Sequence, residues 1–485
     1  MTSYTLPAGR LEEDFKEKRP LYSEGEAITE ANRCIYCFDA PCQTACPTDI
    51  DVPNFIHKIS TGNVKGAART ILESNLLGKS CAHVCPVEVL CAGSCVYQHW
   101  GREPIAIGRL QRFAVDTALG AKPDLLKEKK KPSTGKTIAL IGSGPASLAC
   151  AGHLALDGHK AVIFEKKDIP GGLNTLGIAP YKLFAQDALD EIEWLKTLGD
   201  VEIRTGVSVV EGSAGDGQVS TAELLNDNDA VFLGLGLGAD SAMDLDGEAG
   251  QGVHGAVALI EALKVAPATR ASFSNVKRAL VIGGGNTAID IAHELAIAGI
   301  DDVAMVYRRG TDRMTAYVHE MAAGRADGVE VMSHSIPTKY ERDAKGKLVG
   351  VYVADADDGK AKAGTERLVE CQLVALAIGQ ARLTKLASAF VDVELDAKGR
   401  VLVDDDTCRT GNAKVYAGGD CVNGGKEVVN AAQHGKLAAK AITASFASGR
   451  RQRLNSEPKK QTTLKPSTFC LRAEPEDDGV HKAGW

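Results

Sequence analysis

The chain has 485 residues, of which 44% are hydrophobic and 25% charged, and its formal net charge is −7. The length suggests about three domains, and the composition is ordinary for a globular protein. The acidic balance argues against nucleic-acid and anionic-membrane partners, which require a basic face. The N-terminus lacks the apolar core of a signal peptide, and no run of about 18 apolar residues occurs, so we expect a cytoplasmic chain that does not cross a membrane.

The first predicted domain, residues 1–130, is rich in cysteine. Eight of the 13 cysteines lie between Cys34 and Cys95. In a reducing compartment such groups bind metal more often than they form disulfides. Apolar residues spaced by three and four between Val52 and Leu72 predict two short amphipathic helices, separated by a Gly-Asn turn.

The spacing of these cysteines indicates two iron–sulfur clusters. It is Cys34-x2-Cys37-x4-Cys42-x3-Cys46-Pro47, then Cys81-x3-Cys85-Pro86, then Cys91-x3-Cys95. Closely spaced thiolates can wrap one cluster, and in two-cluster ferredoxins the cysteine followed by Pro binds the other cluster. We therefore expect Cys34, Cys37 and Cys42 on one [4Fe–4S] cluster and Cys46 on a second. Two structural zinc sites are the alternative, but zinc pairs usually stand further apart along the chain.

After a basic linker at 127–136, residues 137–167 predict a strand, a glycine-rich turn, a helix and a second strand. The turn is Gly142-Ser143-Gly144-Pro145-Ala146, and backbone amides at such a helix start can hold a pyrophosphate. Glu165 ends the second strand, where an acid hydrogen-bonds the ribose of an adenine dinucleotide. The context of strand, helix and acid makes this a strong dinucleotide-binding pattern.

A similar stretch, residues 278–310, carries a second turn, Gly283-Gly284-Gly285-Asn286-Thr287-Ala288. Its second strand ends in Arg308 and Arg309 without an acid, and a basic pair there can accommodate the 2′-phosphate of NADP. The alternative is that both arginines form a solvated strand end, which is compatible with NAD. We expect NADPH or NADH as the substrate and favour NADPH slightly.

Residues 414–442 predict one further strand, glycine-rich turn and helix. After Gly449 the sequence is polar, contains Pro and shows no periodicity. We therefore predict that residues 451–485 form an irregular tail.

Two dinucleotide-type units beside iron–sulfur ligands have a mechanistic meaning. A nicotinamide delivers two electrons as a hydride, whereas a cluster accepts one electron at a time, and a flavin can do both. Hydride transfer to a flavin requires no acid–base side chain, and the sequence contains no triad or HExxH motif. We therefore predict no catalytic residue.

Three stretches together resemble the glutamate synthase small-subunit family of flavin reductases. They are GSGPASLACAGHLALDGHKAVIFEKKDIPGGL, VIGGGNTAIDIAHELA and VYAGGDCVNGGKEVVNAAQHGK. The N-terminal stretches CIYCFDAPCQTACPTDIDVPNFI, NLLGKSCAHVCPVEVLCAGSC and IAIGRLQRFA are closer still to the dihydropyrimidine dehydrogenases, in the form of a separate bacterial reductase subunit. The resemblance covers about residues 25–450. It implies FAD, two [4Fe–4S] clusters and NADPH or NADH.

The resemblance implies a ligand set for both clusters. One cluster would be held by Cys34, Cys37, Cys42 and Cys95, and the other by Cys46, Cys85, Cys91 and the amide of Gln111. Cys81 would then bind no iron. Without the resemblance we would choose Cys81 as the eighth ligand, because sulfur binds iron better than an amide oxygen does, and it remains the alternative.

The resemblance also places dinucleotide-binding positions on this chain. Those for FAD are Gly142, Ser143, Gly144, Pro145, Ala146, Glu165, Lys166, Gly171, Gly172, Leu173, Lys182, Val209, Gly419 and Asp420. Those for the nicotinamide cofactor are Gly285, Asn286, Thr287, Ala288, Arg308, Arg309, Ala377, Ile378 and Gly379. Asp420 would bind the sugar-alcohol chain of the flavin, and the start of the following helix would lie near the flavin ring.

We therefore predict an α/β protein with an N-terminal α-helical domain that holds two [4Fe–4S] clusters. Two Rossmann-like domains follow. The FAD-binding domain comprises residues 131–270 and 401–450, and the NAD(P)H-binding domain, residues 271–400, is inserted in it.

From the 485 residues we expect no FMN barrel and no C-terminal clusters of the kind found in larger dihydropyrimidine dehydrogenases. The resemblance thus implies an electron-input subunit in a hetero-oligomer with an FMN-containing catalytic subunit, which reduces uracil or thymine. The spacing of Cys85 and Cys91 and the presence of Gln111 favour this function. A glutamate synthase small subunit, or a donor to another partner, is the alternative. A non-catalytic scaffold is a third hypothesis, against which the intact glycine-rich turns argue.

Overall fold

The structure of the protein is a computed structural model that describes residues 4–17, 19–121, 124–267 and 273–454. Contacts divide the chain into a first unit, Met1–Thr443, and a second, Ala444–Trp485. All the sites considered below lie in the first unit. Of the second unit, only the helical residues to Leu454 are described.

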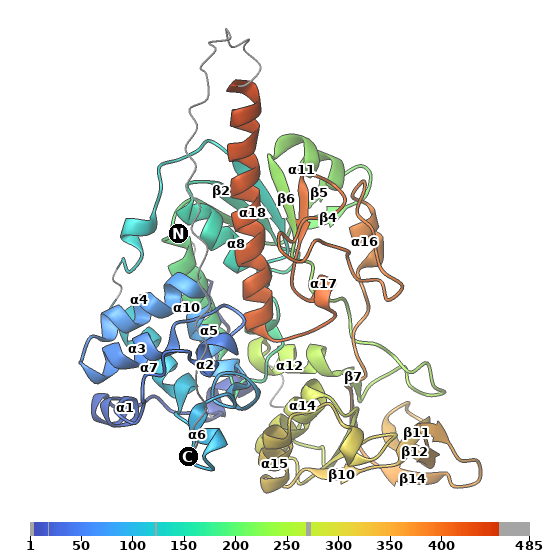
Figure 1. The fold of residues 1–485 in the computed structure, drawn as a ribbon. Helices are drawn as coiled ribbons and strands as arrows, with labels where there is room; N and C mark the ends of the chain where they lie inside the picture. Colours follow the sequence, from blue (N-terminus) through green and yellow to red (C-terminus); the bar gives the residue numbers. More distant parts are fainter. Residues whose placement is uncertain (1–3, 18, 122–123, 268–272, 455–485) are drawn as a thin grey trace, which may run out of the picture. The chain divides into compact units, whose positions relative to one another are not determined.

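The N-terminal part is helical, as predicted (Figure 1). The two helices expected from the apolar spacing are α3, Val52–Ser60, and α4, Val64–Ser74. Gly62 makes the turn between them with φ +77°, and Asn63 caps α4 by accepting a hydrogen bond from Gly66 N at 2.9 Å. The other elements of this part are η1 (Leu11–Asp14), α1 (Glu24–Ala31), α2 (Pro41–Thr44), α5 (Gly78–Val84), η2 (Val87–Val89), α6 (Val96–His99) and α7 (Ile107–Gly120).

A five-stranded parallel sheet follows, in the order β16-β6-β1-β2-β3. β1, α8 and β2 are the first predicted strand–helix–strand unit. The central strands are buried and apolar, because helices cover both faces of a parallel sheet. The elements of this part are η3 (Lys127–Lys129), β1 (Thr137–Ile141), α8 (Pro145–Leu156), β2 (Lys160–Phe164), α9 (Leu173–Leu176), α10 (Ala185–Lys196), β3 (Val201–Arg204), β4 (Ser208–Val210), β5 (Gln218–Ser220), α11 (Thr221–Asp227), β6 (Ala230–Leu233), α16 (Thr384–Ser388), β16 (Val415–Ala417), α17 (Asp420–Asn423) and α18 (Val428–Leu454).

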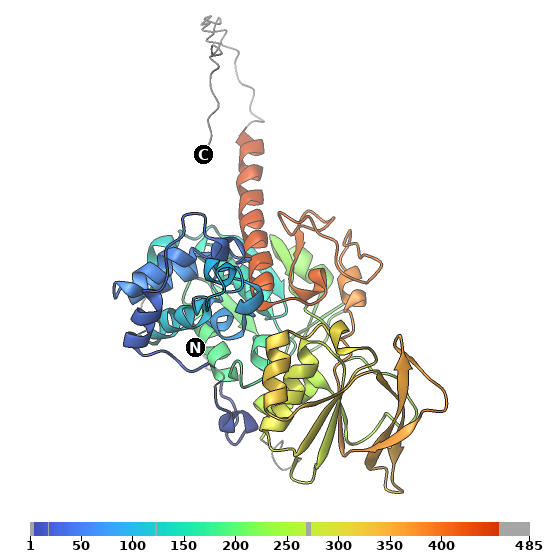
Figure 2. The same ribbon diagram turned by 60° about the horizontal axis from the view of Figure 1, so that its bottom comes forward.

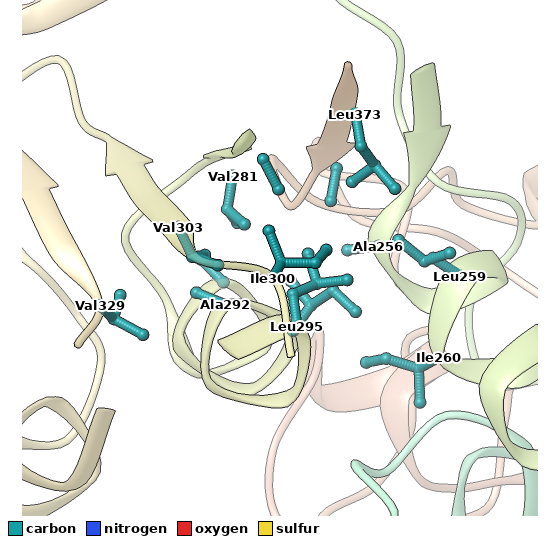
Figure 3. Close-up of a cluster of buried hydrophobic side chains, with 14 of the residues drawn as sticks. Ala256, Leu259, Ile260, Val281, Ala292, Leu295, Ile300, Val303, Val329 and Leu373 are labelled. Atoms are coloured by element: carbon teal, nitrogen blue, oxygen red, sulfur yellow. The ribbon is translucent and has the colours of Figure 1, made fainter. Parts of the chain in front are cut away.

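The second parallel sheet has the order β10-β9-β8-β15-β7. It contains the second predicted unit, β8-α14-β9, and the chain enters it after β6 and leaves it before β16. The predicted insertion of one Rossmann-like part in the other is therefore confirmed. Figure 3 shows the buried side chains between this sheet and its helices. The elements are β7 (Val253–Gly255), α12 (Ala256–Val265), β8 (Arg278–Ile282), α14 (Asn286–Ile297), β9 (Asp302–Val306), η4 (Thr311–Arg313), α15 (Val318–Ala326), β10 (Glu330–Met332) and β15 (Leu373–Leu376).

An antiparallel group of strands interrupts the second sheet between β10 and β15. β12 pairs with β11, β13 and β14. Figure 2 shows these strands in orange, across the second sheet from its yellow helices. Their bounds are β11 (Ser335–Arg342), β12 (Leu348–Asp357), β13 (Lys360–Ala361) and β14 (Arg367–Glu370).

The strand pairing differs from the predicted boundaries between the FAD-binding and NAD(P)H-binding domains at residues 270 and 400. β7 lies within the predicted FAD part, but it pairs with β15 in the second sheet. On the return, Ala387 and Phe390 lie within the predicted nicotinamide part but pack in the core of the first sheet. The two segments in which the chain passes between the sheets run side by side, because Gly238 N donates to Ala381 O at 2.8 Å. Local periodicity does not reveal which sheet a short strand joins, since its partners are distant in sequence.

The last helix is longer than predicted. α18 extends to Leu454, so residues 451–454, expected to be irregular, are helical. Arg, Gln and Leu are good helix formers, and here they outweigh the single Gly449. The rest of the predicted tail, 455–485, lies outside the described residues. In the part of the chain that the structure describes, no helix is both long and apolar enough to cross a membrane.

Candidate flavin, nicotinamide and cluster sites

The first glycine-rich turn lies between β1 and α8. Gly142 has φ +82°, and a Cβ built on it would lie 2.6 Å from the carbonyl oxygen of Gly234 after β6, so only glycine fits there. Gly144 is the N-cap of α8, and Pro145 is its first residue. The first amides of a helix have no intrahelical partner, which makes this end of α8 suitable for a pyrophosphate.

The predicted ribose-binding acid, Glu165, is buried after β2. Its Oε2 accepts hydrogen bonds from N and Oγ of Ser143 at 2.8 and 2.7 Å, and its Oε1 accepts one from Lys167 N at 2.9 Å. Ser143 Oγ in turn accepts from Gly171 N at 2.9 Å. Glu165 thus ties the glycine-rich turn to the segment after β2, and its contact with a ribose stays a prediction.

The double glycine after β2 closes on the same turn. Gly171 and Gly172 have φ +113° and +57°, and a Cβ on Gly172 would lie 2.9 Å from Gly144 Cα. After the next residue, Leu173, Asn174 Oδ1 and Thr175 Oγ1 are buried, and they lack a hydrogen-bond partner among the described residues. Such atoms near a pyrophosphate-type turn fit a polar ligand such as FAD. Neither residue is among those predicted from the sequence, where their signal is two polar residues directly after the GGL segment.

The second predicted FAD segment meets this turn from the C-terminal side of the chain. Gly419 has φ +77°, and a Cβ on it would lie 3.1 Å from the Cβ of Ala146 in α8. Its N–H donates at 3.0 Å to Nδ1 of His434, which is not among the residues predicted from the sequence. Burial raises the pKa of the Asp420 carboxyl, whose Oδ1 accepts from Lys426 N at 3.2 Å. The structure therefore brings this segment to the start of α8.

Three other predicted FAD residues have different surroundings. Lys182 Nζ lies 2.6 Å from Asp290 Oδ1 and 3.0 Å from Glu320 Oε1, which belong to α14 and α15 of the second sheet. Val209 lies in β4 and packs against the core of the first sheet, and Lys166 is exposed. Their contact with FAD stays a prediction.

The second glycine-rich turn repeats the arrangement in the second sheet. A Cβ on Gly283 would lie 2.4 Å from Ala377 O, and one on Gly284 would lie 2.6 Å from the ring of Tyr307. Gly285 is the N-cap of α14, whose first amides can hold a second pyrophosphate. The structure thus brings together two predicted nicotinamide segments that are distant in sequence, Gly285-Asn286-Thr287-Ala288 and Ala377-Ile378-Gly379.

The two arginines after β9 complete the predicted nicotinamide site. Arg308 is exposed and Arg309 is half-buried. Within the described residues, Arg309 Nε is buried and has no hydrogen-bond partner. An unpaired buried guanidinium N–H costs free energy unless a ligand supplies an acceptor, so this position fits an anionic group.

The eight N-terminal cysteines form two groups of four. The first group, Cys34, Cys37, Cys42 and Cys95, lines a mostly apolar cavity of about 360 Å³, its solvent-open part included. Burial is the main cause that raises the pKa of Cys42 to about 12, and the nearby thiols of Cys34 and Cys95 add to it. This thiol stays protonated unless a metal displaces the proton. Four thiols around one apolar cavity fit the donor set of a [4Fe–4S] cluster.

The second group consists of Cys46, Cys81, Cys85 and Cys91. A hydrogen bond between the thiols of Cys85 and Cys81, together with burial, raises the pKa of Cys85 well above its ordinary value. Burial and the nearby Cys46 raise the pKa of Cys91 to about 12. Cys42 of the first group also contributes to this shift, so the two groups adjoin. Among the described residues, no three His, Cys, Asp or Glu side chains are arranged to hold a single metal ion.

The two candidates for the eighth ligand lie on neighbouring helices. Gln111 is buried on α7, and its Nε2 donates to the carbonyl oxygen of Gly78, the first residue of α5, at 2.8 Å. Cys81 lies on α5 itself, and its Sγ accepts from Asn75 Nδ2 at 3.1 Å. The structure places Cys81 beside Cys85, and iron ligation by Gln111 stays a prediction.

Comparison with known proteins agrees with this geometry. The family model described as dihydropyrimidine dehydrogenase domain II, 4Fe-4S cluster, matches residues 11–122, and that of the pyridine nucleotide-disulphide oxidoreductases matches 136–435. The glutamate synthase (NADPH) small chain of Escherichia coli is 32% identical over 452 residues, which cover 88% of this chain and 93% of that protein. The NAD-dependent dihydropyrimidine dehydrogenase subunit PreT of E. coli is 35% identical over 430 residues, 88% of this chain and 96% of that protein.

Solved structures share the fold of the two Rossmann-like parts. Thioredoxin reductase of T. acidophilum has a TM-score of 0.52 at 19% identity, over 64% of this chain and 98% of that one. FprA of Mycobacterium tuberculosis has a TM-score of 0.51 at 19% identity, over 68% and 88%. The family matches and the two relatives show that the chain belongs to the pyridine nucleotide-disulphide oxidoreductase family and carries a 4Fe-4S domain of the dihydropyrimidine dehydrogenase type, so it is an NAD(P)H-dependent flavin and iron–sulfur oxidoreductase subunit.

Proposed function

We propose that this chain is the electron-input subunit of a dihydropyrimidine dehydrogenase. It oxidises NAD(P)H and sends single electrons through two [4Fe–4S] clusters to an FMN-containing partner, which reduces uracil or thymine. FAD supplies the connecting chemistry, because it can accept a hydride and release single electrons.

The observation that carries the proposal is the place of the second cysteine group. Lys436 of α18, the helix that follows the second FAD segment, donates to Thr48 O at 3.1 Å, which fastens α18 beside Cys46. Cys46 adjoins Cys91, and Cys91 adjoins Cys42 of the first group. This supports an order in which electrons leave the flavin part, pass the second group and then the first, and exit from the N-terminal helices.

The chain's own residues bind and orient the cofactors in this function. The turns at Gly142 and Gly283 would present helix amides to two pyrophosphates, and the apolar cavity at Cys42 would shield one cluster from water. Protonation of a pyrimidine ring requires a positioned acid beside a hydride donor. We assign that step to the partner.

A glutamate synthase small subunit is the second candidate. The chain is 32% identical to such a protein over 88% of its own length, close to the 35% with the dihydropyrimidine dehydrogenase subunit. The five residues between Cys85 and Cys91 and the glutamine at 111 favour the first candidate, as the resemblance of these stretches to the dihydropyrimidine dehydrogenases implies.

The test is a reconstitution with the purified chain. We expect one FAD and about eight irons, since two [4Fe–4S] clusters require that number. The chain alone is expected to oxidise NAD(P)H with an artificial acceptor dye and to leave uracil unreduced. An FMN-bearing pyrimidine-reducing subunit should restore uracil reduction, whereas a glutamate synthase large subunit should give no glutamate. Dihydrouracil formed by the chain alone, or glutamate formed with the second partner, would refute the proposal.

A further inference from the structure

Tyr317 is fastened to the second glycine-rich turn. The backbone before it returns to the turn, where Thr315 N donates to Gly284 O at 2.9 Å. Tyr317 N donates at 2.9 Å to Oδ1 of Asn286, the first residue of α14 and a predicted contact of the nicotinamide cofactor. Tyr317 therefore moves with this turn.

The phenol of Tyr317 reaches the flavin part. Its hydroxyl donates at 2.7 Å to Oε1 of Glu427, which directly precedes α18. The flavin ring is expected near this helix start, and Asp420 of the second FAD segment lies just before it in the chain. Burial raises the pKa of Glu427. Burial, with a smaller contribution from the hydrogen bond to Glu427, also raises the pKa of Tyr317 to about 12, so the phenol keeps its proton at neutral pH.

The same side chain also borders the cluster part. The ring of Tyr317 stacks on His319, with centroids 5.6 Å apart and an interplanar angle of 9°. His319 Nε2 lies 3.5 Å from Glu88 Oε2, and Cys85 is close enough to contribute to the raised pKa of Tyr317. Groups from the nicotinamide, flavin and cluster parts thus meet around one aromatic ring.

We propose that Tyr317, through its hydrogen bond to Glu427, is a positioning residue that holds the nicotinamide-binding turn against the start of α18. The inference rests on the proposed function, since it concerns the same electron entry. Hydride transfer requires the reacting atoms about 3–3.5 Å apart, and a displacement of about 1 Å can cost about 100-fold in rate. A hydrogen bond between the turn and the flavin-side helix limits that displacement.

A purely structural role for Tyr317 predicts different rates of flavin reduction from a positioning role, and matched variants can distinguish the two roles. Tyr317→Phe removes the hydroxyl and keeps the ring stacked on His319. Glu427→Ala removes the acceptor, whereas Glu427→Gln keeps an oxygen that can accept from the phenol. Tyr340→Phe is the control, because Tyr340 is buried in β11 and its hydroxyl has no hydrogen-bond partner among the described residues.

The experiment is rapid mixing of the holoprotein with NADPH and with NADH, followed at the flavin absorbance. We expect Tyr317→Phe to keep FAD and iron, to lose at least tenfold in the limiting rate of flavin reduction, and to change KM by less than threefold. Glu427→Ala should match it, the double variant should be no slower than either single variant, and Glu427→Gln should recover most of the rate. Tyr340→Phe should behave as wild type.

Two results overturn the inference. One is a flavin reduction rate in Tyr317→Phe within twofold of wild type, and the other is losses in Tyr317→Phe and Glu427→Ala that multiply in the double variant. If Tyr317→Phe does not retain FAD, Glu427→Ala decides by the same rate criterion. A wild-type chain whose flavin is reduced by neither NADPH nor NADH would instead overturn the proposed function, so the two failures are distinguishable.

Discussion

At the scale of single residues, we propose that the choice between NADPH and NADH depends on the side chains of Arg308 and Arg309. Both follow β9, where the dinucleotide ribose lies in a Rossmann-like fold. Arg309 Nε is buried without a partner in the described part of the chain, which suits a 2′-phosphate better than a solvated strand end. The proposal is therefore a preference for NADPH.

Replacing both arginines with Ala should raise KM for NADPH at least tenfold and leave KM for NADH nearly unchanged. Two charge-assisted hydrogen bonds of about 1.5–3 kcal/mol each would be lost. Steady-state kinetics with an acceptor dye measures the effect. Arg367→Ala is the control, because Arg367 is an exposed arginine that pairs with Asp355 at 2.9 Å on the antiparallel strands. Equal effects on both cofactors, or a wild-type preference for NADH, would contradict the prediction.

The eighth cluster ligand is also a question of single residues. If the amide of Gln111 binds iron, Gln111→Leu should lose or convert one cluster, while Cys81→Ala should leave both intact. Iron content and the EPR spectrum of the reduced protein measure this. Cys371→Ala serves as the control, because Cys371 is a buried thiol in the core beside the second sheet. Loss of a cluster in Cys81→Ala with an intact Gln111→Leu would identify Cys81 as the ligand.

At the scale of elements, helix α10 of the flavin part holds helix α5, which carries Cys81. Glu191 of α10 is buried, and its carboxylate accepts hydrogen bonds from Lys79 N at 2.8 Å and Ser80 N at 3.2 Å, and one from Ser80 Oγ. Lys79 Nζ also pairs with Asp187 of α10 at 2.8 Å. A buried carboxylate that binds the first amides of a helix fixes that helix strongly.

This contact makes stability depend on pH. Burial raises the pKa of Glu191 from 4.5 to about 7, although the bonds from Ser80 and Lys79 oppose the shift. At pH values between these two pKa values, the carboxyl of Glu191 is protonated in the native state and ionised in the unfolded state. Stability therefore falls as pH rises through this window. Glu191→Gln removes the titrating carboxyl group and therefore this dependence of stability on pH.

We expect the melting temperature of the wild type, relative to Glu191→Gln, to fall as pH rises from about 4.5 to about 7. Thermal unfolding of both proteins across this range measures it. Glu193→Gln is the matched control on the same helix, because Glu193 pairs only with Lys196 in the described residues and is partly exposed. Parallel curves for wild type and Glu191→Gln would show that Glu191 does not titrate in this window.

At the scale of the whole molecule, the N-terminal segment joins the cluster part to the second sheet. Leu11 and Phe15 are 5% and 7% exposed and belong to the same hydrophobic core as Leu259 of α12 and Leu295 of α14. Glu12 accepts a hydrogen bond from the backbone of α10. Deleting residues 1–120 would therefore remove core side chains together with the clusters, so a point variant tests this connection better.

Leu11→Ala should lower the free energy of unfolding by about 2–5 kcal/mol, because it leaves a cavity in the core of the second sheet. Denaturant unfolding of the holoprotein measures the loss, and iron and FAD contents should stay unchanged in the native protein. Leu21→Ala is the matched control, since Leu21 is 45% exposed. Equal stability of the two variants would show that the N-terminal segment does not contribute to this core.

The sequence by itself determined those features that depend on local physical chemistry. Helix periodicity defined α3 and α4. Glycines marked both turns, at Gly142 and Gly283, because positive φ or a close backbone approach requires glycine there. The resemblance, carried by those motifs and the cysteine spacing, gave the family and its cofactors. These features are encoded within short segments, so their residues need no distant partner to be recognised.

The tertiary structure alone decided which distant segments meet. It placed β7 in the second sheet, paired Lys182 with Asp290, and buried Leu11 in a core far along the chain. Each of these contacts is chosen by the packing and charge of both partners together. A single segment therefore contains only half of the information, and no local pattern in the sequence could reveal the pairing.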